Sequence, residues 1–317
     1  MSDRIEPDPS TDGIDRRGFL KCMAWAGTGV LWSVGGGILT SRAFGAEAAA
    51  TAAKADFSFA QISDSHIGFS KEANKDVAGT LQVAIDRVNA MTPQADLLIH
   101  TGDLTHLSKP AEFDAVDQIV KGAKVGSTFY VPGEHDVFVD DGKSYLDRYG
   151  KGTRGQGWHS FDHKGVHFIG LVNVANLKPG GLGVLGTEQL DWLKKDVEPL
   201  GSSTPIVVYA HVPLWAVYAK WGWGTSDSEQ ALTRLRKFGA VTVLNGHIHQ
   251  VLQKTEGNIT FHTACSTAFP QPAPGTADSP GPMKNVAADK LRGLLGLSSV
   301  SYAQNKGTLA IVDKPLQ

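Results

Sequence analysis

The chain has 317 residues, of which 41% are hydrophobic, and it contains 36 Gly and 15 Pro. This length and composition predict one large globular domain, or two small ones, with an ample hydrophobic core. The 30 Lys and Arg residues against 32 Asp and Glu give a net charge of −2. Without a basic excess to neutralise many phosphates, the chain is not expected to bind nucleic acid.

Residues 1–46 have the pattern of an export signal. Arg16 and Arg17 precede the uncharged stretch 22–41, which is followed by the small residues of "SRAFGAEAAA". The pattern resembles a twin-arginine signal, which predicts the twin-arginine export machinery as a partner and a periplasmic or secreted location. A retained membrane anchor is the alternative, because about 20 residues can span a bilayer.

Residues 47–317 are expected to form one domain, in which short apolar runs alternate with helical patterns from residue 57 onward. Such alternation predicts βαβ units and a layered α/β domain. The expected strands are 57–63, 95–102, 127–133, 166–173, 205–211 and 240–247. The expected helices are 75–91, 110–122, 187–197 and 227–239.

Residues 270–317 are expected to be an irregular tail. The stretch 270–282 is rich in Pro and Gly, which predicts an extended surface segment. Beyond it, 286–296 predicts a short helix and 307–314 a final strand.

Side chains that bind metals lie at or just beyond the carboxyl ends of five of the expected strands, at the sheet edge where sites form in open α/β sheets. Residues two apart in an extended chain point to the same side, so Asp64 and His66 are expected to grip one ion, and likewise His247 and His249. Carboxylate oxygens with imidazole nitrogens suit Fe, Mn or Zn better than Mg or Ca. The number of candidates indicates two ions. They are Asp64, His66, Asp103, Glu134, His211, His247 and His249.

The blocks "DSH", "GDLT", "GEHD", "AHVP" and "GHIH", in this order within residues 57–265, resemble the calcineurin-like metallophosphoesterases. The resemblance implies a two-sheet sandwich flanked by helices and a phosphate-ester substrate, either a phosphomonoester or a phosphodiester. It also implies two metal ions that activate a bridging hydroxide. One ion would be held by Asp64, His66 and His249 and the other by His211 and His247, with Asp103 bridging both.

By the same resemblance, His135 would protonate the leaving group and Asp136 would orient the His135 ring. The family has Asn where this chain has Glu134. As a third carboxylate, Glu134 is expected to bind the second ion, to favour an Fe(III)–M(II) pair and to favour diesters over dianionic monoesters. Two alternatives stay open. One is a metal-binding protein with little hydrolysis because of Glu134, and the other is a membrane-surface phosphatase acting on lipid-linked substrates.

The remaining candidates each have a structural and a functional interpretation. His106 lies either at the site mouth or in a solvated loop, and Lys71 and Lys75 either steer an anionic substrate or begin a helix. The aromatic residues that follow His211 form either a substrate wall or an ordinary packed loop: Trp215, Tyr218, Trp221 and Trp223. His100 and His262 are expected in the core or at its edge, and the hairpin residues His159, His163 and His167 at the surface.

Overall fold

The structure is a computed structural model that describes residues 29–35, 38–44, 55–175, 177–178, 180–303 and 308–317. Arg16 and Arg17 lie outside these residues, so the export signal stays a prediction. Within the segment expected to be the signal, β1 (Gly29–Gly35) and β2 (Ile38–Phe44) pair antiparallel. No helix among the described residues is long and apolar enough to cross a membrane.

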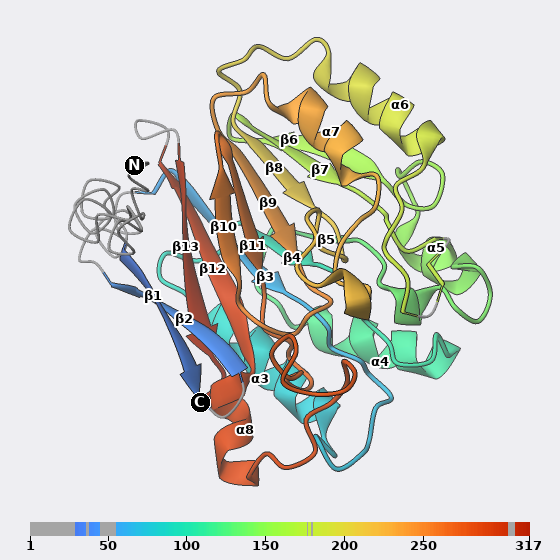
Figure 1. The fold of residues 1–317 in the computed structure, drawn as a ribbon, viewed down its shortest axis with the longest axis vertical. Coiled ribbons are helices and arrows are strands. Elements are labelled where there is room, and N and C mark those ends of the chain that lie inside the picture. Colours follow the sequence, from blue (N-terminus) through green and yellow to red (C-terminus); the bar gives the residue numbers. More distant parts are fainter. Residues whose placement is uncertain (1–28, 36–37, 45–54, 176, 179, 304–307) are drawn as a thin grey trace, which may run out of the picture.

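Two sheets packed face to face form the centre of the fold (Figure 1). The five-stranded sheet has the order β13 (Thr308–Pro315), β12 (Gly296–Ala303), β3 (Phe57–Ile62), β4 (Leu97–His100), β5 (Ser127–Tyr130). The six-stranded sheet has the order β10 (Gln253–Glu256), β11 (Ile259–Thr263), β9 (Val241–Asn245), β8 (Ile206–Tyr209), β7 (Val166–Gly170), β6 (His159–His163).

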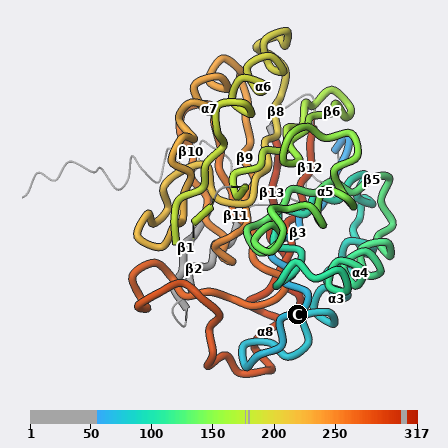
Figure 2. The backbone as a smooth tube through the Cα atoms, turned by 90° about the vertical axis from the view of Figure 1, so that its right-hand side faces the viewer, coloured from blue at the N-terminus to red at the C-terminus, as the bar shows by residue number. Residues whose placement is uncertain are grey.

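Helices cover the outer face of each sheet, and both views place the two groups of helices on opposite sides (Figures 1 and 2). The helices α3 (Val77–Asn89), α4 (Pro110–Val120) and α8 (Ala288–Leu294) lie against the five-stranded sheet. The helices α6 (Thr187–Val197) and α7 (Ser228–Leu235) pack on the other sheet. The chain is therefore the predicted sandwich of two sheets flanked by helices.

The alternation of side chains in β3 shows why the strand is buried on both faces. Phe57 and Phe59 point into the core between the sheets, whereas Ala60 and Ile62 pack against the helices. Because side chains alternate along a strand, an uninterrupted apolar run is required wherever both faces are covered. The strand β7 is likewise buried on both faces, so the prediction that the hairpin histidines lie at the surface fails there.

His167 in β7 is buried rather than on the surface as predicted. Its Nδ1 lies 2.8 Å from Asp162 Oδ1, and its Nε2 lies 3.0 Å from Asp196 Oδ2 in α6. The reason is that β7 lies inside the six-stranded sheet, between β6 and β8, and that α6 covers its helix-facing side. By contrast, His163 and His159 are half-buried, and His100 and His262 lie in the interior as expected.

The C-terminal residues are more regular than the predicted tail. The helix α8 and the strand β13 match expected elements, but β12 (Gly296–Ala303) was not predicted. It pairs antiparallel with β3 on one side and β13 on the other, and so lies inside the five-stranded sheet. The run "GLSSVSYA" carries three Ser, and the burial of two of them, Ser298 and Ser301, depends on these neighbouring strands rather than on hydrophobicity. Between β11 and α8 the chain is irregular, as expected.

Parallel pairing directs most strand ends to one edge of the sandwich. The pairs β3–β4, β4–β5, β7–β8, β8–β9 and β9–β11 are all parallel. The loops that leave the carboxyl ends of these strands therefore meet at one edge, which is where open α/β sheets form their sites.

Candidate metal centre

All seven predicted ligands converge at this edge. Each follows the end of a strand within five residues: Asp64 and His66 after β3, Asp103 after β4, Glu134 after β5, His211 after β8, and His247 and His249 after β9. Glu134 begins the short 3-10 helix η1 (Glu134–Asp136).

The ligand atoms form two groups joined by one carboxylate. One group comprises Asp64, His66 and His249, and the other comprises Glu134, His211 and His247; within each group the atoms lie within 4.8 Å of one another. Asp103 Oδ2 lies 3.5 Å from His66 Nε2 and 3.5 Å from His211 Nε2. Asp103 thus stands between the groups, in the bridging position that the resemblance implies.

Glu134 occupies the second group with both of its oxygens. Its Oε2 lies 2.9 Å from His211 Nε2, and its Oε1 lies 3.0 Å from His247 Nδ1. Burial raises the pKa of Glu134, but the charges of His247 and His211 outweigh burial and hold it well below its usual value. The carboxylate is therefore ionised where the second ion is expected.

The backbone at the ligands differs from the predicted extended geometry. The strands β3 and β9 end at Ile62 and Asn245, before the ligands begin. The ligands then adopt the left-handed region, which is uncommon for residues other than Gly and clusters at functional sites. The φ angles are 53° at Asp64, 41° at His66, 51° at Asp103, 70° at His247 and 55° at His249.

Two glycines of the motifs allow this close approach. A Cβ on Gly102, whose φ is +96°, would lie 2.5 Å from His211 Nδ1. A Cβ on Gly246 would lie 2.6 Å from Asp64 Oδ2. Both distances are shorter than real Cβ contacts, so the Gly in "GDLT" and in "GHIH" makes room for the neighbouring ligand.

Backbone carbonyls fix which ring nitrogen of two histidines faces the centre. His211 Nδ1 donates to Thr101 O at 2.7 Å, and His249 Nδ1 donates to Phe269 O at 2.5 Å. A carbonyl only accepts, so each Nδ1 carries a proton, and each Nε2 is the ring nitrogen that faces the centre and can bind an ion once it has lost its own proton. This is the arrangement by which proteins orient histidine ligands of metals.

The donor set fits metal ions. Glu134 Oε2, His211 Nε2 and His247 Nδ1 are buried, and apart from the Glu134–His211 and Glu134–His247 pairs they have no hydrogen-bond partner among the described residues. Asp64 is also ionised, because His249 and His211 lower its pKa by more than burial raises it. Buried carboxylates that face histidine ring nitrogens at these distances suit a cation between them, because a buried charge needs a partner of opposite charge. The residues present therefore suit two ions, and their oxygen and nitrogen atoms are compatible with Fe, Mn or Zn.

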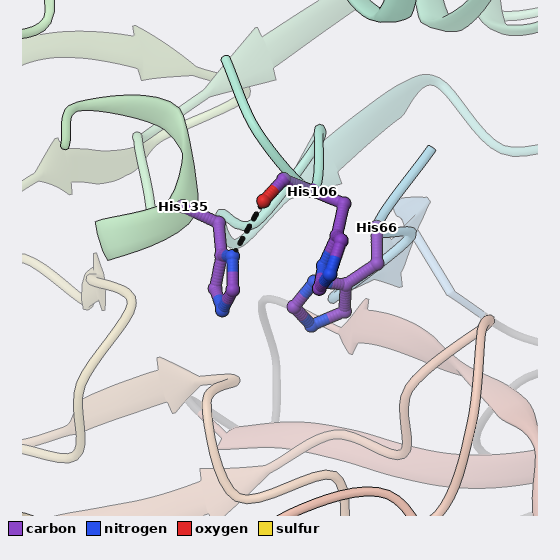
Figure 3. A group of neighbouring side chains, drawn as sticks. All are labelled: His66, His106 and His135. Carbon is purple, nitrogen blue, oxygen red and sulfur yellow. Dashed lines mark hydrogen bonds between the residues drawn. The ribbon is translucent and has the colours of Figure 1, made fainter. Parts of the chain in front are cut away.

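His135 lies beside the first group and is held by a backbone atom (Figure 3). Its Nδ1 donates to His106 O at 2.7 Å, which leaves Nε2 available. Its ring centroid is 4.8 Å from that of His66 and 4.9 Å from that of His106, on which it stacks at 17°. The ring is thereby positioned at the mouth of the centre without a carboxylate partner.

Asp136 does not orient the His135 ring as predicted. Its Oδ1 accepts hydrogen bonds from the amide and hydroxyl of Thr105, both at 2.8 Å. Its Oδ2 accepts from the amides of Leu104 at 3.0 Å and Gly133 at 2.9 Å. These bonds engage both oxygens, so the carboxylate links the loop that carries Asp103 to the loop that carries Glu134.

A cavity of about 620 Å³ opens above the centre, and His66, Asp103, Glu134 and His247 contribute to its lining. His106 also lines it, which favours the site-mouth interpretation of that residue. Additional lining residues that the sequence did not indicate come from loops without a motif: Phe69, Phe138, Lys178, Phe269, Gln271 and Lys284.

The aromatic residues that follow His211 divide between the two interpretations left open by the sequence. Trp221 and Trp223 line the cavity. Trp215 instead packs on Phe261, with ring centroids 5.1 Å apart, and Tyr218 packs edge-on against Trp221. The loop after His211 thus combines both interpretations, with two rings at the cavity and two in packing.

Comparisons with known proteins agree with this geometry. The family model described as calcineurin-like phosphoesterase matches residues 57–251. A 3′,5′-cyclic-nucleotide phosphodiesterase from Nostoc sp. strain PCC 7120 is 26% identical over 222 residues, 68% of this chain and 80% of that protein. A probable glycerophosphodiester phosphodiesterase from Arcobacter nitrofigilis is 28% identical over 225 residues, 65% of this chain and 77% of that protein.

Among solved structures, a dimetal phosphatase from Danio rerio shares the fold. It superposes with a TM-score of 0.60 at 14% identity, covering 83% of this chain and 97% of that one. The family match spans more than half of the 317 residues and contains all seven candidate ligands. The chain therefore belongs to the calcineurin-like phosphoesterase family and is a hydrolase of phosphate esters.

Proposed function

We propose that this protein is a dinuclear-metal-dependent phosphodiesterase. The observation that carries the proposal is the pair of ligand groups with Asp103 Oδ2 midway, 3.5 Å from His66 Nε2 and from His211 Nε2, at a cavity of about 620 Å³. The names of the Nostoc and Arcobacter relatives support a diester rather than a monoester as the substrate.

Seven of these residues would bind the ions, and His135 would transfer a proton. Asp64, His66 and His249 would hold one ion, Glu134, His211 and His247 the other, and Asp103 would contact both. When bound, two such ions neutralise charge on the phosphate oxygens and lower the pKa of water, so that hydroxide is available near neutral pH.

His135 is the group placed to protonate the leaving oxygen. Its Nδ1 is engaged with His106 O, so Nε2 is the nitrogen available to a substrate. Protonation matters because an alkoxide leaves poorly, and a positioned general acid contributes about 10²–10⁴-fold to the rate.

The test compares bis-p-nitrophenyl phosphate with p-nitrophenyl phosphate after the protein is loaded separately with Mn, Fe or Zn. We expect faster hydrolysis of the diester and two equivalents of bound metal. Asp103→Asn should lower both activity and metal content, because Asp103 faces both groups. Two bound ions without hydrolysis of either ester would reject the proposal and support the non-hydrolytic alternative.

Export by the twin-arginine route to the periplasm is a separate part of the proposal. It is supported by Arg16 and Arg17 ahead of the uncharged stretch 22–41. Residues 1–46 fused to a reporter that is active only after export should carry it out of the cytoplasm. Replacing both arginines by Lys should stop this, and unchanged export would contradict the assignment.

A further inference from the structure

The rim of the cavity is positively charged, in contrast to its floor. Lys71 follows β3, Lys178 lies between β7 and α6, and Lys284 lies between β11 and α8, yet all three line one cavity. Glu72 is the lining carboxylate that is not a candidate ligand, so the charges at the rim sum to about +2. The whole chain has a net charge of −2, so this excess is local.

The three ammonium groups are available to a ligand. All three residues are exposed. Among the ion pairs of the described residues, none involves Lys71, Lys178 or Lys284, whereas other lysines such as Lys143 and Lys164 are paired with carboxylates. Lysines in a shared cavity that lack a carboxylate partner are suited to bind a phosphate or another anion as point charges.

The size of the cavity indicates that the scissile phosphate is only part of the substrate. A water molecule takes about 30 Å³ of liquid volume, so one phosphate and two ions fill a minor part of about 620 Å³. The remaining wall carries the rings of Phe69, Phe138, Trp221 and Trp223. Pockets of this size with apolar walls and a few polar groups are typical for whole organic ligands.

We infer that the rim is a second anion-binding subsite, and that the preferred substrate is a phosphodiester with a further phosphate or similar anionic group beyond the scissile one. The inference rests on the proposed function for the floor of the cavity. Lys71, Lys178 and Lys284 hold the outer anion, while the aromatic wall contacts the organic part between the two charges.

The test uses two diesters with the same scissile bond. They are the p-nitrophenyl ester of thymidine 5′-phosphate and the same ester with an added 3′-phosphate. Metal-loaded protein should show a KM about tenfold lower for the second, as expected from three screened ion pairs. Added salt should reduce this difference. The triple variant Lys71→Gln, Lys178→Gln, Lys284→Gln should lose the preference and keep its activity on the first ester.

Lys75→Gln is the matched control, because Lys75 is exposed and lies four residues from Lys71 but does not line the cavity. It should retain the full preference. Equilibrium binding of thymidine 3′,5′-bisphosphate and thymidine 5′-phosphate supplies a readout without turnover. The wild type should bind the bisphosphate about tenfold more tightly than the monophosphate, and the triple variant should bind the two with the same affinity.

Equal KM for the two esters, or a preference that survives in the triple variant, would overturn the subsite while leaving the phosphodiesterase proposal intact. If neither ester were hydrolysed but the binding preference were present and lysine-dependent, the subsite would stand and the proposed function would fail. The two proposals can therefore be rejected independently.

Discussion

Asp136→Asn separates the role that the structure gives this residue from the role expected by resemblance. The carboxylate is fully buried and accepts four hydrogen bonds, two on each oxygen. Asn keeps the shape but replaces one oxygen by an NH2 group, which is a donor. The best arrangement turns that group toward Thr105, whose hydroxyl can accept a hydrogen bond. The backbone amide of Thr105 then loses its acceptor, and the hydrogen bonds from Leu104 and Gly133 are made to a neutral oxygen instead of a charged one.

The expected cost follows from these contacts. A buried donor left unsatisfied costs about 1–3 kcal/mol, and a hydrogen bond to a charged group contributes about 1.5–3 kcal/mol. Burial and the neighbouring Asp103 raise the pKa of Asp136 to about 6, so the fold disfavours its charge, and removing that charge offsets part of the loss. We therefore expect Asp136→Asn to lower the free energy of unfolding by about 1–2 kcal/mol at about pH 7. Urea denaturation of the protein in EDTA, followed by circular dichroism, measures this difference.

The control is Asp141→Asn, which changes an exposed aspartate five residues away in the same loop. It should alter the free energy of unfolding by less than about 0.5 kcal/mol. An Asp136→Asn variant that is as stable as the wild type but has a changed pH dependence of kcat would contradict this role of Asp136. That result would mean that the carboxylate acts on the His135 ring after all.

Three further predictions concern other contacts. Glu134→Gln should weaken binding of the second ion and raise the ratio of monoester to diester hydrolysis at least about tenfold, because unit charges about 4 Å apart interact by several kcal/mol. Metal analysis measures the first effect, and the hydrolysis rates of both p-nitrophenyl esters measure the second. For a diester whose leaving group is an alkoxide, His135→Asn should lower kcat about 100-fold, whereas His106→Phe should stay within about threefold, because the backbone carbonyl and the ring stack remain. Rates of alcohol release from such a diester measure both effects. Burial lowers the pKa of His167, but its hydrogen bonds to Asp196 and Asp162 outweigh burial and raise it above its usual value. The protonated ring therefore stabilises the fold at pH values below the pKa of the unfolded state, and this stabilisation is lost as the pH rises through the pKa of the folded state. Urea denaturation should therefore show a larger loss of stability for His167→Gln at about pH 5.5 than at about pH 9.

The fold was predictable wherever burial on both faces leaves a continuous apolar run. Such runs identified β3, β4, β7, β8 and β9, and the helices between them indicated parallel pairing. The strand β12 was not predictable in this way, since Ser298 and Ser301 are buried beside β3. Ser298 Oγ donates to Asp313 Oδ1 at 2.7 Å, a partner 15 residues away that only the folded sheet provides. Tertiary hydrogen bonds thus decide what local hydrophobicity cannot.

The candidate ligands were predictable because motif spacing and strand order determine which loops meet. The direction of each side chain was not. Asp136 follows His135 directly, yet its carboxylate bonds to Leu104, Thr105 and Gly133. The positions of the rim lysines were equally unpredictable from the sequence, because Lys178 and Lys284 lie in loops of irregular structure that carry no recognisable pattern.

Five of the seven ligands have a left-handed backbone conformation, which contacts between the ligand loops hold in place. Such a conformation costs about 1–3 kcal/mol for each residue other than Gly, so five of them cost about as much as the whole stability of a typical domain. They persist only where surrounding contacts leave no alternative. Asp64 N donates to Gly102 O at 3.0 Å, His66 N donates to Asp103 O at 2.9 Å, and His247 N donates to Asp64 Oδ1 at 3.1 Å. Each ligand loop is thus tied to another ligand loop by its backbone. Ions that bind this centre would add stability to the folded chain by mass action.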